Sequence, residues 1–109
     1  MRYTHYDTTY ELAFYKSRYI ADDSTFIEAW CKEDGEDYWE PYADVTKCLY
    51  ERPADGCSFL DTNNVGHLIQ AMVDEGYVEL TGRTASSGWC EYPEGRFNKE
   101  WLEGLEELT

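Results

Sequence analysis

One amphipathic stretch in the middle of the chain constrains its fold more than any other feature. Between residues 61 and 75, five apolar residues recur at helical spacing and form one face: Val65, Leu68, Ile69, Met72 and Val73. Asp61 or Thr62 can cap the start of this helix by accepting backbone N–H groups, and Gly76 can end it in a left-handed conformation. We therefore predict a helix over residues 61–75, which buries one face and needs a sheet to cover it.

The rest of the chain consists mainly of short segments in which apolar and polar residues alternate, as in β-strands. The strands expected from this pattern cover residues 2–6, 9–16, 25–32, 38–49, 77–81 and 89–92, and residues 57–60 are expected to form a short extended entry into the central helix. A second helix is expected over residues 98–107, with Asn98 as its cap. The order of elements predicts a single α+β domain over residues 1–109, with an antiparallel sheet of about five to six strands under the central helix.

The alternation also assigns faces and turns to these strands. In residues 25–32, the more apolar set is predicted to face the core: Ile27, Ala29 and Cys31. In residues 38–49, the predicted inward positions are Trp39, Ala43 and Val45. Turns are expected at residues 7–8 and 82–88, and Pro93 is expected to end the last strand.

Composition restricts the classes of function. Aromatic residues make up 17% of the chain, which is typical of a folded domain rather than of a disordered acidic tail. No apolar run approaches the length of a membrane span, and residues 1–5 lack the apolar core of a signal sequence, so we expect a cytoplasmic protein. The formal net charge is −14, and the nine basic residues are scattered among acidic ones, which argues against direct binding of nucleic acid.

No set of residues has the spacing of a catalytic or metal site. No two of the four cysteines are separated by two residues, as zinc and redox motifs require: Cys31, Cys48, Cys57 and Cys90. They are expected to be reduced and buried, and a Cys48–Cys57 disulfide across a loop is the open alternative. The two histidines, His5 and His67, have no partner at helical spacing. We therefore expect no metal, no cofactor and no enzymatic activity.

Three segments resemble a pattern found in one family. They are Phe59-Leu60-Asp61-Thr62-Asn63-Asn64, Leu80-Thr81-Gly82-Arg83-Thr84, and Gly88 to Pro93 continuing to Arg96-Phe97-Asn98. On these residues the chain is similar to a family of small acidic proteins of unknown function carried by phages and conjugative elements of gut bacteria. The resemblance is most specific at residues 61–64 and 81–84. It brings no catalytic residue, and it implies a mobile-element context in which small proteins often oppose host defences.

Acidic residues are concentrated between residues 21 and 44, where nine carboxylates accompany one lysine. The nine are Asp22, Asp23, Glu28, Glu33, Asp34, Glu36, Asp37, Glu40 and Asp44. Carboxylates on one face of a strand recur about every 6.5–7 Å, so a row of them can resemble the phosphates of a nucleic acid. Glu103 and Glu107 are expected to share one face of the C-terminal helix and to extend this surface. Trp30 is the predicted aromatic anchor, unless it joins Phe26 in a second core layer under that helix.

These features predict a mobile-element anti-defence protein, similar in principle to anti-CRISPR and anti-restriction DNA mimics. It would bind a basic nucleic-acid-binding protein or complex, such as a CRISPR effector or a restriction enzyme, in the cytoplasm of a bacterial host. The alternative is a non-enzymatic acidic adaptor or dimerising module of a phage or conjugative element. The charge can also serve solubility alone, and because it opposes self-association we expect a monomer or weak homodimer.

Overall fold

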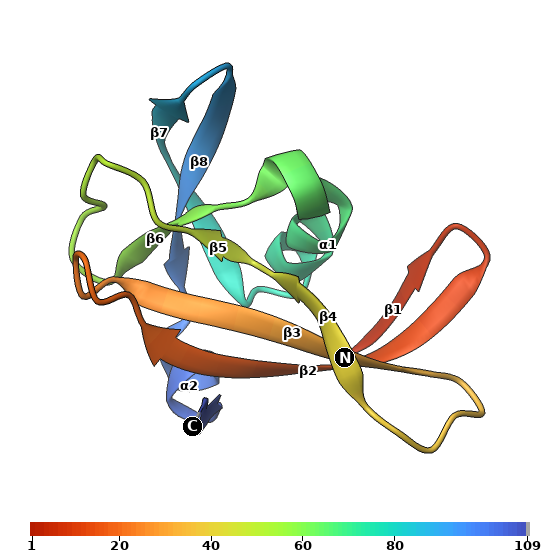
Figure 1. The fold of residues 1–109 in the computed structure, drawn as a ribbon. Coiled ribbons are helices and arrows are strands. Elements are labelled where there is room, and N and C mark those ends of the chain that lie inside the picture. The colour runs from red at the N-terminus through yellow and green to blue at the C-terminus, as the bar shows by residue number, and fades with distance from the viewer. Residues whose placement is uncertain (109) are drawn as a thin grey trace.

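The computed structural model of the chain describes residues 1–108 and has the predicted α+β fold (Figure 1). In chain order the elements are β1 (Arg2–His5), β2 (Thr8–Arg18), β3 (Thr25–Glu33), β4 (Glu40–Asp44), β5 (Thr46–Lys47), β6 (Cys57–Leu60), α1 (Thr62–Asp74), β7 (Val78–Ser87), β8 (Cys90–Phe97), α2 (Lys99–Glu103) and β9 (Glu106–Glu107). Within these residues the strands form two sheets, so the single sheet expected from the sequence is divided in two.

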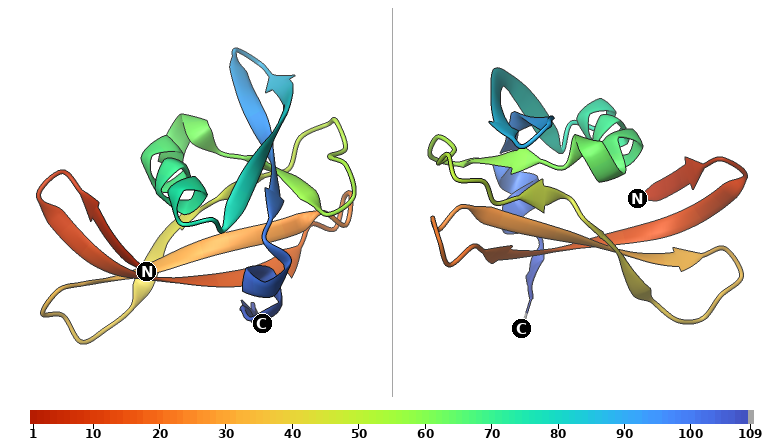
Figure 2. Two further views of the ribbon diagram at one scale, coloured as in Figure 1. Left: turned by 180° about the vertical axis from the view of Figure 1, so that it is seen from behind. Right: turned by 45° about the horizontal axis from the view of Figure 1, so that its top comes forward.

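The first sheet has the strand order β1-β2-β3-β4, and β9 pairs with β2 in parallel. Its centre is the β2–β3 hairpin, in which β3 is paired along its whole length. One face of this sheet is apolar because Ile27, Ala29 and Cys31 alternate along β3 and are buried, as predicted. Figure 2 shows that α1 and the second sheet lie on the same side of the first sheet.

The second sheet has the strand order β5-β6-β8-β7, and its β7–β8 hairpin extends away from the rest of the molecule (Figure 1). Both strands of the hairpin are longer than predicted. Gly82, with a φ of +92°, lies in a bulge between Leu80 and Thr84 and does not form the hairpin turn. The turn lies at residues 88–89. Pro93 does not end β8, because it precedes the residues that pair with β6.

Helix α1 confirms the predicted central helix. Asp61 is its cap, and its carboxylate accepts hydrogen bonds from the backbone N–H of Asn64 at 3.3 Å and from the side-chain amide of Asn64 at 2.8 Å. The helix ends before Gly76, which has a φ of +81°, as predicted. Three residues of its apolar face are buried: Leu68, Ile69 and Met72.

The main core lies between the first sheet, α1 and the second sheet (Figure 2). It includes Leu12, Phe14, Ile27, Val45, Leu60, Leu68, Met72, Val78 and Phe97. The packing requires glycine at position 95 of β8, because a Cβ on Gly95 would lie 2.7 Å from side-chain carbons of both Leu60 and Val78. Any larger residue at this position would have to displace both of those side chains.

The second helix is shorter than predicted. Helix α2 is capped by Asn98, as predicted, and the Asn98 side chain accepts a hydrogen bond from the backbone N–H of Trp101 at 2.9 Å. The helix ends at Gly104, and residues 106–107 form β9, which pairs with β2. Strand pairing therefore replaces the last turns of the predicted helix.

Two further expectations for the first sheet are wrong. Trp39 is 41% exposed and precedes β4, so it does not face the core. Its ring instead lies 5.4 Å from the ammonium of Lys32. Of the other predicted inward positions, Val45 is buried and Ala43 is half-buried. The first hairpin turn lies at residues 6–7, one position earlier than predicted.

Candidate partner-binding face

The face of the first sheet that points away from α1 carries polar and aromatic side chains. Because Ile27, Ala29 and Cys31 point into the core, Glu28 and Trp30 on the same strand point to the opposite side. Both side chains are half-buried. We call this side the outer face, and its central residues are Tyr15, Glu28, Trp30, Asp44 and Glu106.

One register of residues crosses the outer face through four strands. Glu28 of β3 lies opposite Asp44 of β4 on one side and opposite Tyr15 of β2 on the other. Tyr15 lies in turn opposite Glu106 of β9. Residues in register on neighbouring strands share a face, and their strands are about 4.8 Å apart. Three carboxylates and one tyrosine therefore form a line, which we call the outer row: Glu106, Tyr15, Glu28 and Asp44.

A shallow recess of about 310 Å³ lies beside the outer row. The residues that line this aromatic recess are Tyr15, Trp30, Trp39, Glu106, Glu107 and Leu108. The rings of Tyr15 and Trp30 pack edge to face, with centroids 6.1 Å apart. The indole N–H of Trp30 donates to a carboxylate oxygen of Glu28 at 2.6 Å, which holds the ring beside the outer row. Aromatic faces flanked by carboxylates attract cations through both the charge and the ring quadrupole.

The carboxylates of the outer row have no positive partner among the described residues. Within residues 1–108, no arginine or lysine forms an ion pair with Glu28, Asp44 or Glu106. Glu28 and Asp44 lie directly opposite each other, and like charges in register repel. A cationic group brought by another molecule would therefore be attracted to this row.

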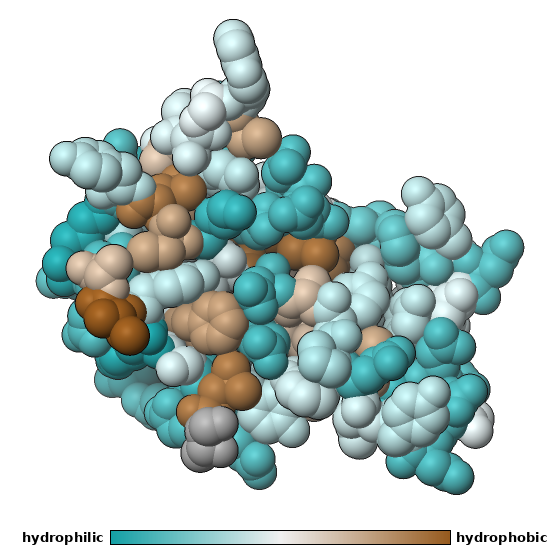
Figure 3. All heavy atoms as spheres, viewed as in Figure 1, coloured by the Kyte–Doolittle hydropathy of each residue, from teal (hydrophilic) through white to brown (hydrophobic). Residues whose placement is uncertain are grey.

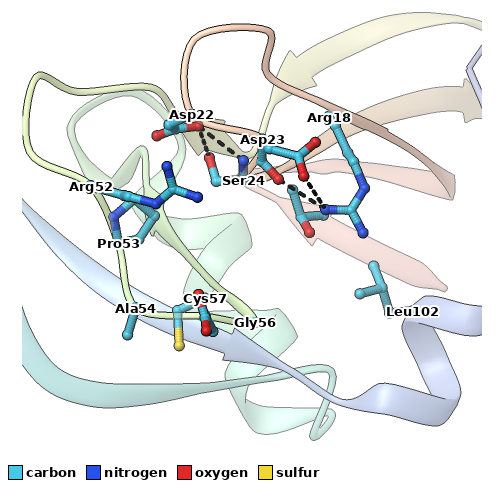
Figure 4. Close-up of a pocket in the computed structure, with 12 residues that line it drawn as sticks. Arg18, Asp22, Asp23, Ser24, Arg52, Pro53, Ala54, Gly56, Cys57 and Leu102 are labelled. Atoms are coloured by element: carbon cyan, nitrogen blue, oxygen red, sulfur yellow. Dashed lines mark hydrogen bonds and ion pairs between the residues drawn. The ribbon is translucent and has the colours of Figure 1, made fainter.

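Asp22 and Asp23 lie in the β2–β3 turn and line a cavity of about 330 Å³ together with Arg18 and Arg52 (Figure 4). Asp22 accepts from the backbone N–H of Ser24 at 2.9 Å and from its hydroxyl at 2.6 Å. Burial raises the pKa of Asp22, but the Ser24 bonds and the charge of Arg52 outweigh burial and hold the pKa below its ordinary value. Arg18 donates to the Asp23 carbonyl at 2.9 Å, and its guanidinium lies 3.7 Å from the Asp23 carboxylate. Both acids thus help to hold the turn and have arginines beside them.

The acidic β3–β4 loop lies at the other end of β3. Five predicted contact residues lie in this loop or at the strand ends beside it, and all are exposed: Glu33, Asp34, Glu36, Asp37 and Glu40. Gly35, with a φ of +89°, makes the turn, and Arg2 pairs with the Asp34 carboxylate at 3.0 Å. In Figure 3, the surface at the lower right, where this loop lies, is mostly hydrophilic, whereas apolar side chains gather in the centre and on the left. The loop is therefore an acidic tip that is separate from the outer row.

The sequence predicts Glu103 and Glu107 on one helix face, and this prediction is wrong. Glu103 belongs to α2 and Glu107 belongs to β9. Both residues nevertheless line one hollow beside Lys16 and Lys99, and Glu107 also lines the aromatic recess. The ammonium of Lys16 donates to the carbonyl of Leu102 at 2.9 Å, so this lysine satisfies the end of α2.

The structure brings three of the predicted contact residues together on the outer face: Glu28, Trp30 and Asp44. Glu107 lies in register with Lys16, one position from Glu106, and reaches only the edge of the aromatic recess. The structure also adds residues that the sequence pattern did not single out. Tyr15 could have been found from the alternation in β2, because Leu12 and Phe14 point into the core and Tyr15 must point outward. Glu106 could not have been found, because the sequence indicates a helix there and only the pairing of β9 with β2 brings it to the outer row.

A family model described as a domain of unknown function (DUF4313) matches residues 13–108. The chain belongs to this DUF4313 family. This agrees with the predicted membership in a family of unknown function. No curated protein and no solved structure matches the chain. The DUF4313 match includes all four residues of the outer row.

The two segments with the most specific resemblance have structural roles in this DUF4313 chain. Asp61 of the first segment caps α1. In the second segment, the Thr81 hydroxyl and the Arg83 guanidinium donate to the Glu94 carboxylate at 2.8 and 3.0 Å, and the Ala54 N–H donates to it at 2.9 Å. Burial raises the pKa of Glu94, but these donors and the Arg83 charge outweigh burial and hold the pKa below its ordinary value of 4.5. These side chains are therefore already occupied within the fold.

Other kinds of site find little support in the described part of the DUF4313 chain. Residues 1–108 contain no group of three or more His, Cys, Asp or Glu side chains that could hold a metal ion. All four cysteines are free, so Cys48 and Cys57 form no disulfide. Burial raises the thiol pKa of Cys31, Cys48 and Cys57, which disfavours the thiolate that a nucleophile requires. None of the helices in this part is long and apolar enough to cross a membrane.

Proposed function

We propose that this protein is a non-enzymatic inhibitor that binds a basic, nucleic-acid-binding surface of another protein through its outer face. The observation that carries the proposal is the outer row, in which three carboxylates lie in register across the sheet. No cation among residues 1–108 pairs with them. The expected partner is a host defence protein, such as a restriction enzyme or a CRISPR effector, in the bacterial cytoplasm.

Charge favours this kind of partner. A surface that binds nucleic acid is an array of lysine and arginine side chains that neutralise phosphates. The net charge of −14 attracts such a surface from a distance, and the outer row offers negative charges on rigid, paired strands. Because the strands are already ordered, binding costs less conformational entropy than it would for a flexible acidic tail.

The aromatic recess adds a contact that is specific for arginine. Trp30 and Tyr15 present their rings beside Glu106 and Glu107, so a guanidinium could meet an aromatic face and a carboxylate at once. Aromatic side chains are frequent among the residues that contribute most binding energy in protein interfaces. Trp30 is therefore proposed as the anchor of the contact, as the sequence predicts.

Electrophoretic competition tests the proposal with labelled duplex DNA bound to a panel of restriction enzymes and guide-loaded CRISPR effectors. The test variant neutralises the outer row through Glu28→Gln, Asp44→Asn and Glu106→Gln. The matched control makes the same change in net charge elsewhere, at three exposed carboxylates near the end of α1: Asp74→Asn, Glu75→Gln and Glu79→Gln. The parent chain and the control should displace DNA from at least one member of the panel, and the row variant should need at least ten times more protein. A row variant as active as the control would mean that the outer row is not the surface that displaces DNA.

A second candidate function is the acidic adaptor, which the exposed aromatic residue Trp89 favours. Trp89 lies in the β7–β8 turn and is 104% exposed, which leaves a large apolar side chain free for contact. An adaptor of this kind would leave DNA bound in the competition experiment. Its binding to a partner would be lost in Trp89→Ala and retained in the row variant.

A further inference from the structure

The two histidines of the chain lie side by side, although they are far apart in sequence. His5 is in β1 and His67 is in α1, and Figure 1 shows these two elements next to each other. Their Nδ1 atoms are 3.2 Å apart, whereas their ring centroids are 4.6 Å apart. Because the nitrogens are closer than the ring centres, the Nδ1 edges of the two rings face each other.

The distance between the two nitrogens suits a shared metal ion. Imidazole nitrogens bind zinc at about 2.0–2.1 Å, so two of them on one ion stand roughly 2.8–3.4 Å apart for angles of about 90–110°. The observed 3.2 Å lies within this range. His67 is exposed and His5 is half-buried, so water can reach the ion and fill its remaining positions.

The Tyr3 hydroxyl and His5 compete for the same nitrogen of His67. The Tyr3 hydroxyl, on a side chain that is 5% exposed, lies 2.9 Å from the same Nδ1 of His67. A neutral imidazole nitrogen has either one lone pair or one proton. The His67 Nδ1 therefore cannot form a well-aligned bond with both the Tyr3 hydroxyl and His5. An ion between the two nitrogens would use both lone pairs, and the Tyr3 hydroxyl could bond to a water on that ion.

We propose that His5 and His67 bind one late first-row transition-metal ion through their Nδ1 atoms. Imidazole ligands suit Zn²⁺, Ni²⁺ and Cu²⁺, whereas carboxylates suit Mg²⁺ and Ca²⁺. The ion would link β1 to α1 and so tie the first hairpin to the central helix. This site is separate from the outer face and does not depend on the proposed function.

A nickel titration of the untagged full-length chain tests the site. Ni²⁺ is the probe, and the melting temperature is measured at pH 7.5 with and without the ion. The main comparison is His5→Asn with His67→Gln, a double variant that keeps every cysteine and carboxylate of the parent. Ni²⁺ should raise the melting temperature of the parent, and each single histidine variant should bind it at least tenfold more weakly. An equal shift in the parent and the double variant, or no shift in the parent at 1 mM Ni²⁺, would overturn the proposal.

Two further measurements keep the test decisive if the double variant folds poorly. In the parent, bound Ni²⁺ should broaden the NMR signals of both histidine rings and of Tyr3 before it affects the indole of Trp89, which lies at the tip of the β7–β8 hairpin. Broadening that begins elsewhere would contradict the proposal. The variant Glu28→Gln with Asp44→Asn should bind Ni²⁺ as the parent does, and a loss of binding there would assign the ion to the acidic outer face.

Discussion

Glu94 and Glu28 are carboxylates on neighbouring sheets, and they differ in burial and in the groups that surround them. Glu94 is 2% exposed and accepts hydrogen bonds from Thr81, Arg83 and Ala54. Glu28 is half-buried, accepts one from the indole of Trp30, and faces the carboxylate of Asp44. The described part of the fold thus pairs the buried charge of Glu94 with Arg83 and gives the charge of Glu28 no cationic partner.

This contrast assigns the two carboxylates different roles, one in stability and one in binding, which the acidic sequence alone does not distinguish. A buried carboxylate that loses its partners destabilises the folded state, so Glu94 should matter for stability. Like charges that solvent can reach repel one another weakly, so half-buried Glu28 and exposed Asp44 should matter little for stability and more for an encounter with a basic partner. Substitutions in the two regions should therefore change different measured quantities.

Truncation of the buried face of α1 should have the largest effect on stability and sets the scale for the others. Leu68→Ala and Ile69→Ala should each lower the free energy of unfolding by about 2–5 kcal/mol, because they remove buried methyl groups and leave a cavity. Urea denaturation measures this loss. A cost below about 0.5 kcal/mol at both positions would mean that the assigned face of α1 is wrong.

Glu94→Ala should cost about 3 kcal/mol, at the low end for breaking a buried ion pair, because Arg83 stays partly exposed. The substitution leaves the Ala54 N–H without its acceptor, whereas the Arg83 guanidinium keeps Glu51 and the Arg52 carbonyl. The matched control is Glu91→Ala on the same strand, where the side chain is exposed and the cost should be below about 1 kcal/mol. Equal costs at the two positions would remove the contrast between buried and exposed carboxylates.

The pH dependence of stability should reflect the ionisation of Glu94. Because the folded pKa of Glu94 lies below its ordinary value of 4.5, its contribution is complete above that pH and is lost as the pH falls through the folded value. The stability gap between the parent chain and Glu94→Gln should therefore shrink as the pH falls from 7 to 3. Denaturation curves at several pH values measure the gap, and a gap that widens on acidification would reverse the assigned sign.

Asp61→Ala should have a smaller effect, about 1 kcal/mol, because it removes a helix cap and no apolar core side chain. Asp61→Asn keeps an acceptor for the Asn64 N–H and should recover most of the loss. Thermal melts of the two variants give the difference. If both variants lost the same stability, the side chain would act through something other than capping.

Local sequence patterns predicted the elements whose signals lie within the element itself. The apolar spacing and caps of α1 and the alternation in β3 were sufficient, because both are properties of a few adjacent residues. The division into two sheets and the pairing of β9 with β2 depend on contacts between distant segments. For this reason the pattern indicated a helix at Glu106, and it could not show that His5 lies beside His67.

Only part of the candidate site could be predicted from the sequence, because the rest depends on contacts between distant segments. Acidic composition and alternation place Glu28 and Trp30 on one face, and no long-range contact is needed for that inference. Composition alone cannot tell which carboxylates are compensated. Asp22 and Asp23 look equivalent to Glu28 in sequence, but the fold places arginines beside them.

Neutralising the outer row should have the smallest effect on stability and a large effect on association. Glu28→Gln with Asp44→Asn should raise the free energy of unfolding by about 0.5 kcal/mol, because it removes a repulsion between residues in register. The amide that replaces the Glu28 carboxylate carries no charge, but its oxygen can still accept from the Trp30 indole, so the aromatic recess should persist. A loss of more than about 1 kcal/mol would show that the carboxylates support the fold, contrary to the comparison with Glu94.

The salt dependence of the binding rates should show how much the outer row contributes to association. The Debye length falls from about 30 Å at 0.01 M salt to about 8 Å at physiological ionic strength, so attraction between the outer row and a basic partner should weaken over this range. For the parent chain, the association rate should fall more steeply with salt than the dissociation rate rises. In the row variant with Glu28→Gln, Asp44→Asn and Glu106→Gln the salt slope should be shallower. In the control set near the end of α1, which removes the same number of charges, it should stay close to that of the parent. Stopped-flow measurements with a partner found in the competition panel give both slopes. Equal slopes in the two variants would mean that overall charge, not the outer row, attracts the partner.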